Sequence, residues 1–80
     1  MNSIDIYNKA FSEVFSVDII LLNDNFSKET AGNWDSVHQL AIVTALEDAF
    51  DIMLDAPDII AFTSYAKGKE LLAKYEITIE

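Results

Sequence analysis

The sequence lacks cysteine and arginine entirely, and it has one histidine, one proline and two glycines in 80 residues. Without cysteine the chain forms neither a disulfide nor a thiolate metal site, and a single histidine does not make a structural zinc site, so no bound metal is expected. Its longest aliphatic run, residues 19–22, is far shorter than the roughly 20 residues that span a bilayer. The first residues also lack the cationic start of a secretory signal. We therefore expect a cytoplasmic protein that does not enter a membrane.

Acidic residues outnumber basic ones by 14 to five, which gives the chain a formal charge of −9 at pH 7. Nucleic acid and anionic membrane surfaces are negatively charged and bind positively charged proteins, so neither is an expected partner. Basic protein surfaces are favoured instead, because they gain from electrostatic steering and complementarity. An acidic surface that only keeps a protein in solution would have the same composition, so charge alone leaves both interpretations open.

Helical periodicity is clear in the first half of the chain. In a first helix, which Ser3 would cap, apolar residues form one stripe with Phe11 and Phe15 as its main anchors. A second helix, from about Ser36 to Phe50, has the best-defined pattern. Its apolar arc, predicted to face the core, consists of Leu40, Ile42, Val43, Leu46 and Phe50.

The segment between these two helices, residues 16–33, has no helical periodicity. Its Asn23-Asp24-Asn25 run is a strong turn signal. A loop this long in a compact domain is unusual, so we expect it to be pinned to the core or to be functional. Phe26 and Trp34 are the expected pins.

Two shorter helices are predicted in the second half. Asp55 caps the first of them, and Pro57 lies in its first turn, where a missing amide proton costs little. Thr63 or Ser64 caps the last helix. Gly68 is expected to weaken that helix by up to about 1 kcal/mol relative to alanine.

These elements predict an all-α domain of residues 1–80. It is a small four-helix bundle, with three longer helices, one short helix and a long loop between the first two. Residues 77–79 alternate like a strand without an evident partner and are expected to form a tail. The predicted core consists of Phe11, Phe15, Leu40, Val43, Leu46, Phe50, Ile60 and Leu72.

The start of the second helix carries the residues of greatest chemical interest. Asp35 and Ser36 are both favoured at a helix start, because their side-chain oxygens accept bonds from the first amides. Ser36 also forms a capping-box pattern with Gln39, three residues later. Ser36 is therefore either a helix cap or a serine presented at the positive end of the helix dipole, where an attached phosphate would be stabilised.

His38, the only histidine, lies two residues after Ser36. Side chains two apart on a helix do not face each other, and no third residue is placed to orient the imidazole. No glycine-rich turn supplies an oxyanion hole either. We therefore do not expect the chain to perform nucleophilic catalysis by itself.

A longer pattern surrounds the serine. It consists of Asp35-Ser36-Val37, Leu40, Val43, Leu46-Glu47 and Phe50-Asp51. This pattern resembles the acyl carrier protein family, in which an Asp-Ser-Leu motif opens the second helix and the serine carries a phosphopantetheine arm. The resemblance runs from about Leu21 to about Leu72 and includes Pro57. The chain departs from the family at Val37, which replaces the usual leucine, and at Lys69, where the last helix is usually apolar.

The resemblance implies a carrier that is not itself an enzyme. A phosphopantetheinyl transferase would attach the arm of coenzyme A to Ser36, so phosphopantetheine would be the covalent cofactor. The thiol of the arm would carry an acyl or aminoacyl group as a thioester between loading and transferring enzymes with basic docking surfaces. Trp34 before the motif is more typical of carriers in specialised biosynthetic pathways than of fatty-acid housekeeping carriers. Such a carrier is expected to be a monomer.

The exposed side of the second helix is the expected partner-binding face. Val37, Ala41, Thr44 and Asp48 lie opposite the apolar arc, although Ala41 and Thr44 are equally well explained as neutral filler. Ala41 also stands where many fatty-acid carriers have an acid. Val37 is expected to make apolar contact, and the nearby acids are expected to steer the encounter. The predicted partner-binding residues are Asp35, Val37, Ala41, Thr44, Glu47, Asp48 and Asp51.

A second interpretation needs no modification. The chain would be an acidic helical adaptor with the same fold, and its exposed face would bind partners directly. Ser36 would then be only a helix cap. The two interpretations differ in whether Ser36 carries a phosphopantetheine.

Overall fold

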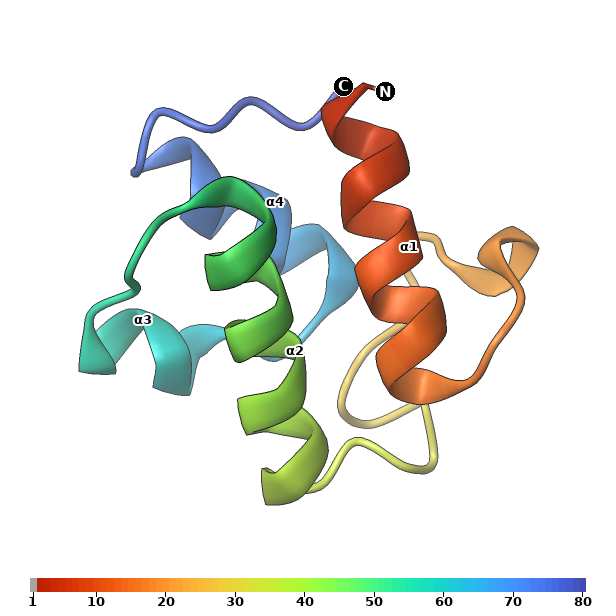
Figure 1. Ribbon diagram of the computed structural model, residues 1–80. Helices are drawn as coiled ribbons and strands as arrows, with labels where there is room; N and C mark the ends of the chain where they lie inside the picture. The colour runs from red at the N-terminus through yellow and green to blue at the C-terminus, as the bar shows by residue number, and fades with distance from the viewer. Residues whose placement is uncertain (1) are drawn as a thin grey trace.

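The computed structural model describes residues 2–80, which form an all-α bundle (Figure 1). Its helices are α1 (Ser3–Phe15), α2 (Ser36–Phe50), α3 (Ala56–Ala61) and α4 (Tyr65–Ala73), with a short 3₁₀ turn, η1 (Ile19–Leu21), in the loop between α1 and α2. Three helices are longer and α3 has six residues, and residues 2–80 contain no strand. The predicted four-helix fold is therefore confirmed. No helix in this part of the chain has the length and apolar character needed to cross a membrane.

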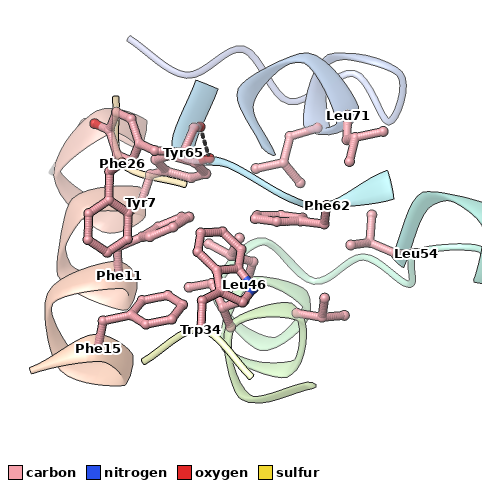
Figure 2. Close-up of a cluster of buried hydrophobic side chains, with 13 residues drawn as sticks. Tyr7, Phe11, Phe15, Phe26, Trp34, Leu46, Leu54, Phe62, Tyr65 and Leu71 are labelled. Carbon is pink, nitrogen blue, oxygen red and sulfur yellow. Dashed lines mark hydrogen bonds between the residues drawn. The ribbon is translucent and has the colours of Figure 1, made fainter. Parts of the chain in front are cut away.

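An aromatic cluster fills the centre of the bundle (Figure 2). Phe11 lies in its middle, with the ring centroids of its aromatic neighbours 4.9–6.0 Å away. These neighbours are Tyr7, Phe15, Phe26, Trp34, Phe62 and Tyr65. The expected anchors of α1, Phe11 and Phe15, are thus buried, and Phe26 and Trp34 do pin the long loop to the core.

The predicted core is wrong at Leu40, which is 60% exposed. The buried stripe of α2 consists of Gln39, Ile42, Val43 and Leu46, which recur at the i, i+3, i+4, i+7 spacing of one helix face. Polar Gln39 occupies the place on this stripe that the apolar pattern assigned to Leu40. Val43 and Leu46 are buried as predicted, whereas Phe50 is only half-buried.

The predicted core is also wrong at Ile60, which is 76% exposed. Asp58 and Phe62, four residues apart, both face inward, so Ile60 midway between them points outward. Asp58 is buried because its carboxylate accepts bonds from Lys74 Nζ at 2.6 Å and from the Tyr75 hydroxyl at 2.5 Å. This ion pair joins α3 to the end of α4.

Gly68 of α4 faces α1 at very close range. A Cβ on this residue would lie 2.2 Å from the Tyr7 hydroxyl oxygen and 2.5 Å from Cζ of Phe62. The Tyr7 hydroxyl donates to the Tyr65 carbonyl at 2.6 Å, and burial raises the pKa of Tyr7, so the group stays a donor. Glycine, which the sequence identified only as a weak helix former, is therefore required by packing.

The last residues of the chain lie beside the start of α1 (Figure 1). Ser3 was expected to cap α1, but Asn2 is the N-cap residue and no side chain caps that helix. The Ser3 hydroxyl instead donates to the Thr78 carbonyl at 2.7 Å and accepts from the Glu80 amide at 2.8 Å. The tail after α4 is thereby held against the start of α1, a contact that no local pattern indicated.

The caps of the last two helices follow the sequence more closely. Ser64 is the N-cap of α4, and its hydroxyl accepts from the Lys67 amide at 2.9 Å. Asp55 is the N-cap residue of α3 with Pro57 in the first turn, although the Asp55 side chain makes no cap bond. Both helix starts are therefore predicted correctly, and only the bonding of Asp55 differs.

Candidate functional site

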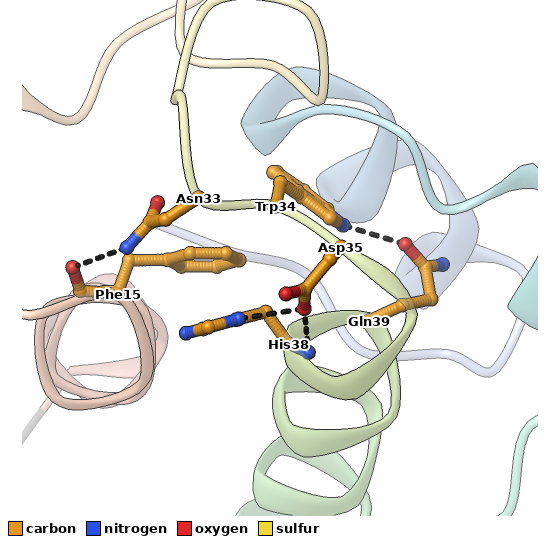
Figure 3. Close-up of polar contacts among 6 residues, drawn as sticks. All are labelled: Phe15, Asn33, Trp34, Asp35, His38 and Gln39. Carbon is orange, nitrogen blue, oxygen red and sulfur yellow. Dashed lines mark hydrogen bonds and ion pairs between the residues drawn. The ribbon is translucent and has the colours of Figure 1, made fainter.

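Asp35, and not Ser36, caps α2 (Figure 3). One oxygen of Asp35, Oδ1, accepts from the backbone amide of His38 at 2.9 Å. Ser36 is the first residue inside the helix, and Gln39 makes its bonds elsewhere, so the capping box read from the sequence does not form. The interpretation of Ser36 as only a cap is therefore wrong.

The Ser36 side chain is exposed at the positive end of α2. Within residues 2–80 its hydroxyl takes part in no hydrogen bond. The first amides of a helix have no partner inside the helix, and they attract negatively charged groups. A phosphoester on Ser36 would thus be attached where the backbone favours an anion.

The His38 ring lies beside the Phe15 side chain of α1, which covers one of its faces (Figure 3). It stacks on Phe15 with a centroid distance of 5.6 Å and an interplanar angle of 18°. Its Nδ1 lies 2.8 Å from Oδ1 of Asp35. The bonds from the His38 backbone and then its ring hold the pKa of the Asp35 carboxyl below its usual value, so Asp35 stays ionised beside the serine.

Three large apolar side chains, two on the first turns of α2 and one on α3, face solvent. Val37 is 72% exposed, Leu40 is 60% exposed and Ile60 is 76% exposed. The end of α3 lies against the first turns of α2, because Gln39 Nε2 donates to the carbonyls of Ile59 and Phe62 at 2.6 and 2.7 Å. We call Val37, Leu40 and Ile60 the apolar patch. The sequence did not assign Leu40 and Ile60 to a surface, because their periodicity placed them in the core.

The predicted partner-binding residues lie mostly where they were expected. Asp35, Val37, Ala41, Thr44, Asp48 and Asp51 are exposed. Asp51 is the C-cap residue of α2 in the left-handed conformation, with φ 54°. Glu47 differs, because it is half-buried and its Oε2 accepts from the Leu54 amide at 2.8 Å. Glu47 thus stabilises the loop after α2 through one of its two carboxylate oxygens.

Cavities and metal-ligating clusters do not define this site. An open groove of about 360 Å³ lies between α1 and α2. It is lined by Ile6, Lys9, Ala10, Glu13, Ala45 and Ala49. Ala45 is roughly 13 Å along the helix axis from Ser36, so the groove does not reach the serine. Across residues 2–80, no three His, Asp or Glu side chains gather in a way that would hold a metal ion.

Comparison with known proteins assigns the chain to no family. No protein-family model, no curated protein and no solved structure matches the chain. The arrangement around Ser36 is therefore the basis on which a function is proposed.

Proposed function

We propose that the chain is a monomeric cytoplasmic carrier protein with a phosphopantetheine arm on Ser36. In this proposal the chain catalyses nothing itself, and the arm carries an acyl or aminoacyl group as a thioester between partner enzymes. The observation that carries the proposal is the division of roles at the start of α2. Asp35 performs the capping, and Ser36 remains exposed with a hydroxyl that is not needed for the fold.

The modification itself requires little from the chain. The Ser36 oxygen would displace adenosine 3′,5′-bisphosphate from coenzyme A, forming one phosphorus–oxygen bond and breaking another. A transferase would supply the base that takes the serine proton. The amides and dipole of α2 would stabilise the resulting phosphodiester, typically by several tenths of a kcal/mol to about 1 kcal/mol at an exposed helix start. The bound arm would also keep its cargo at a high effective concentration near each partner.

The surroundings of Ser36 suit an enzyme that must approach the serine closely. Two residues of the apolar patch, Val37 and Leu40, lie within four residues of Ser36 and offer contact area close to the hydroxyl. The acidic residues Asp48 and Asp51 lie farther along α2, where they would steer a basic partner. An apolar centre with a charged rim is the usual anatomy of a protein interface.

The test is attachment of the arm in vitro. Incubation with coenzyme A, magnesium and a promiscuous phosphopantetheinyl transferase should add one phosphopantetheine per chain, read by intact mass. Ser36→Ala should abolish the addition and leave the free energy of unfolding nearly unchanged, because Asp35 remains as the cap.

Ser64→Ala is the matched control. Ser64 also lies at a helix start, but its hydroxyl does the capping. This variant should still be modified, and it should lose about 1 kcal/mol of stability, as is typical when a serine cap is removed. If the wild type stays unmodified with several transferases, the carrier proposal fails. The adaptor, which uses the apolar patch without modification, then explains the surface better.

A further inference from the structure

Gln39 is a buried polar residue, only 9% exposed, in the first turns of α2. Its Oε1 accepts from the Trp34 indole N–H at 2.5 Å (Figure 3). Its Nε2 donates to the Ile59 carbonyl at 2.6 Å and to the Phe62 carbonyl at 2.7 Å. The indole is only a donor and the two carbonyls are only acceptors, so a primary amide is the side chain that satisfies all three.

The short helix α3 depends on contacts from outside itself. A helix of six residues is marginal alone, and at its end the Ile59 carbonyl accepts one long backbone bond, from the Phe62 amide at 3.3 Å. At its start, Asp58 is bonded to Lys74 and Tyr75 near the end of α4. At its end, the Gln39 side chain of α2 donates to the carbonyls of Ile59 and Phe62. Gln39 is therefore one of the polar anchors that hold α3 in place.

Gln39 also lies between the two halves of the apolar patch. On one side it is bonded to Trp34, two residues before Ser36, and Leu40 follows it directly. On the other side it is bonded to the carbonyl of Ile59, the residue before Ile60. One side chain thus links the segment that carries Ser36 to the segment that carries Ile60.

We propose that Gln39 is a positioning residue that fixes the distance between Ser36 and Ile60 and so keeps the apolar patch assembled for docking. This inference rests on the proposed carrier function and names the residue that sets the geometry of its docking surface. Gln39 is itself buried, so a partner does not touch it. Its effect on docking is carried by α3.

Two substitutions separate hydrogen bonding from packing. Gln39→Met keeps the length of the side chain and removes all three bonds. Gln39→Glu keeps the shape and the acceptor for Trp34, but it sets a carboxylate oxygen against the Ile59 and Phe62 carbonyls.

Hydrogen exchange of the amides in residues 59–62 should accelerate about tenfold or more in Gln39→Met. The reason is that losing one hydrogen bond raises the population of the open, exchanging state by up to about tenfold. Gln39→Glu should be faster still. Exchange in the middle of α1 reports global unfolding and serves as the internal reference.

A distance measurement reads the geometry without any partner. The chain has one tryptophan and no cysteine, so a fluorophore on Ile60→Cys pairs with Trp34 alone. Energy transfer should show a single narrow distance distribution with Gln39 present and a broader one in the Gln39→Met background.

Transferase kinetics then connect the geometry to docking. Gln39→Met should raise KM for the carrier about three- to tenfold, the effect of losing one interface contact, with kcat within about twofold. Leu40→Ala is the matched control, because it removes a patch residue directly and should raise KM while leaving exchange in α3 unchanged. In an Ile60→Ala background Gln39→Met should add little to KM, since the side chain that it positions is gone.

The outcomes are distinguishable. Unchanged exchange and distance in both Gln39 variants would overturn the inference, and so would fast exchange with an unaltered KM. If the wild type is not modified at all, the carrier function fails, and exchange and distance alone decide whether Gln39 fixes α3.

Discussion

The substitution Gly68→Ala tests whether close packing or helix propensity governs α4. By propensity alone, alanine in a helix interior should stabilise the protein by about 1 kcal/mol. In the structure, the added Cβ would lie 2.2 Å from the Tyr7 hydroxyl oxygen and 2.5 and 3.0 Å from two atoms of the Phe62 ring. Tyr7 and Phe62 are both fully buried, so neither can swing into solvent.

The magnitude follows from the two groups that must move. Forcing an extra methyl into a packed core costs about 1–3 kcal/mol. Displacing the Tyr7 hydroxyl from the Tyr65 carbonyl leaves a buried polar group unpaired, which costs about 1–3 kcal/mol more. After the propensity gain is subtracted, we expect a net loss of about 1–5 kcal/mol. That is a large part of the roughly 4–12 kcal/mol that stabilises a domain of this size, and each kcal/mol lowers Tm by about 4–8 °C.

Urea unfolding, followed by circular dichroism, measures this loss directly. Gly32→Ala is the control, because no atom lies within 4 Å of its added Cβ. This variant should lose only the about 1–2 kcal/mol of stability that a positive φ, here 81°, costs a residue with a side chain. Tyr7→Phe removes the nearest clashing atom, so the Gly68→Ala and Tyr7→Phe losses should be less than additive. A Gly68→Ala protein as stable as the wild type would refute the packing explanation.

Three further predictions concern pH, burial and docking. The hydrogen bond from Lys74 lowers the pKa of Asp58. The stability that Asp58 contributes is therefore present above the unfolded pKa of about 3.9, and it is lost as the pH falls through the lower, folded pKa. In urea melts, the stability of Asp58→Asn should depend less on acid pH than that of the wild type. Phe50→Ala should cost less than the about 3–5 kcal/mol of a buried ring, because Phe50 is half-buried. In stopped-flow measurements, Asp48→Lys should slow transferase association and flatten its salt dependence, whereas Val37→Asp should mainly shorten the lifetime of the complex. If neither changes these kinetics, this face is not the docking surface.

The helix boundaries were predictable because their signals are local. The bounds of α2, from Ser36 to Phe50, agree with the expectation at both ends. Cap residues and turn signals act on the amides and carbonyls of their own neighbours, so they can be read without knowing the rest of the fold. Ser3 shows where this fails, because its hydroxyl bonds with residues 78 and 80, more than 70 positions away.

The candidate site was predicted in position but not in bonding. Asp35 and Ser36 were both acceptable caps, and propensity does not distinguish between neighbouring residues that can each accept from a first-turn amide. The structure resolves the choice in favour of Asp35, which His38 engages through both its backbone and its ring. Only this assignment leaves the serine hydroxyl available.

The errors in the core and the presence of the apolar patch have one physical cause. Periodicity assigns apolar residues to the buried side, but at two positions the buried side is taken by a polar residue whose partners are distant in sequence. Gln39 bonds to α3, and Asp58 bonds to residues that follow α4. Because successive residues on a helix are rotated by about 100°, burying Gln39 and Asp58 turns the apolar Leu40 and Ile60 outward. The same two polar residues therefore anchor α3 and create the apolar surface beside Ser36, so replacing either one should disturb both together.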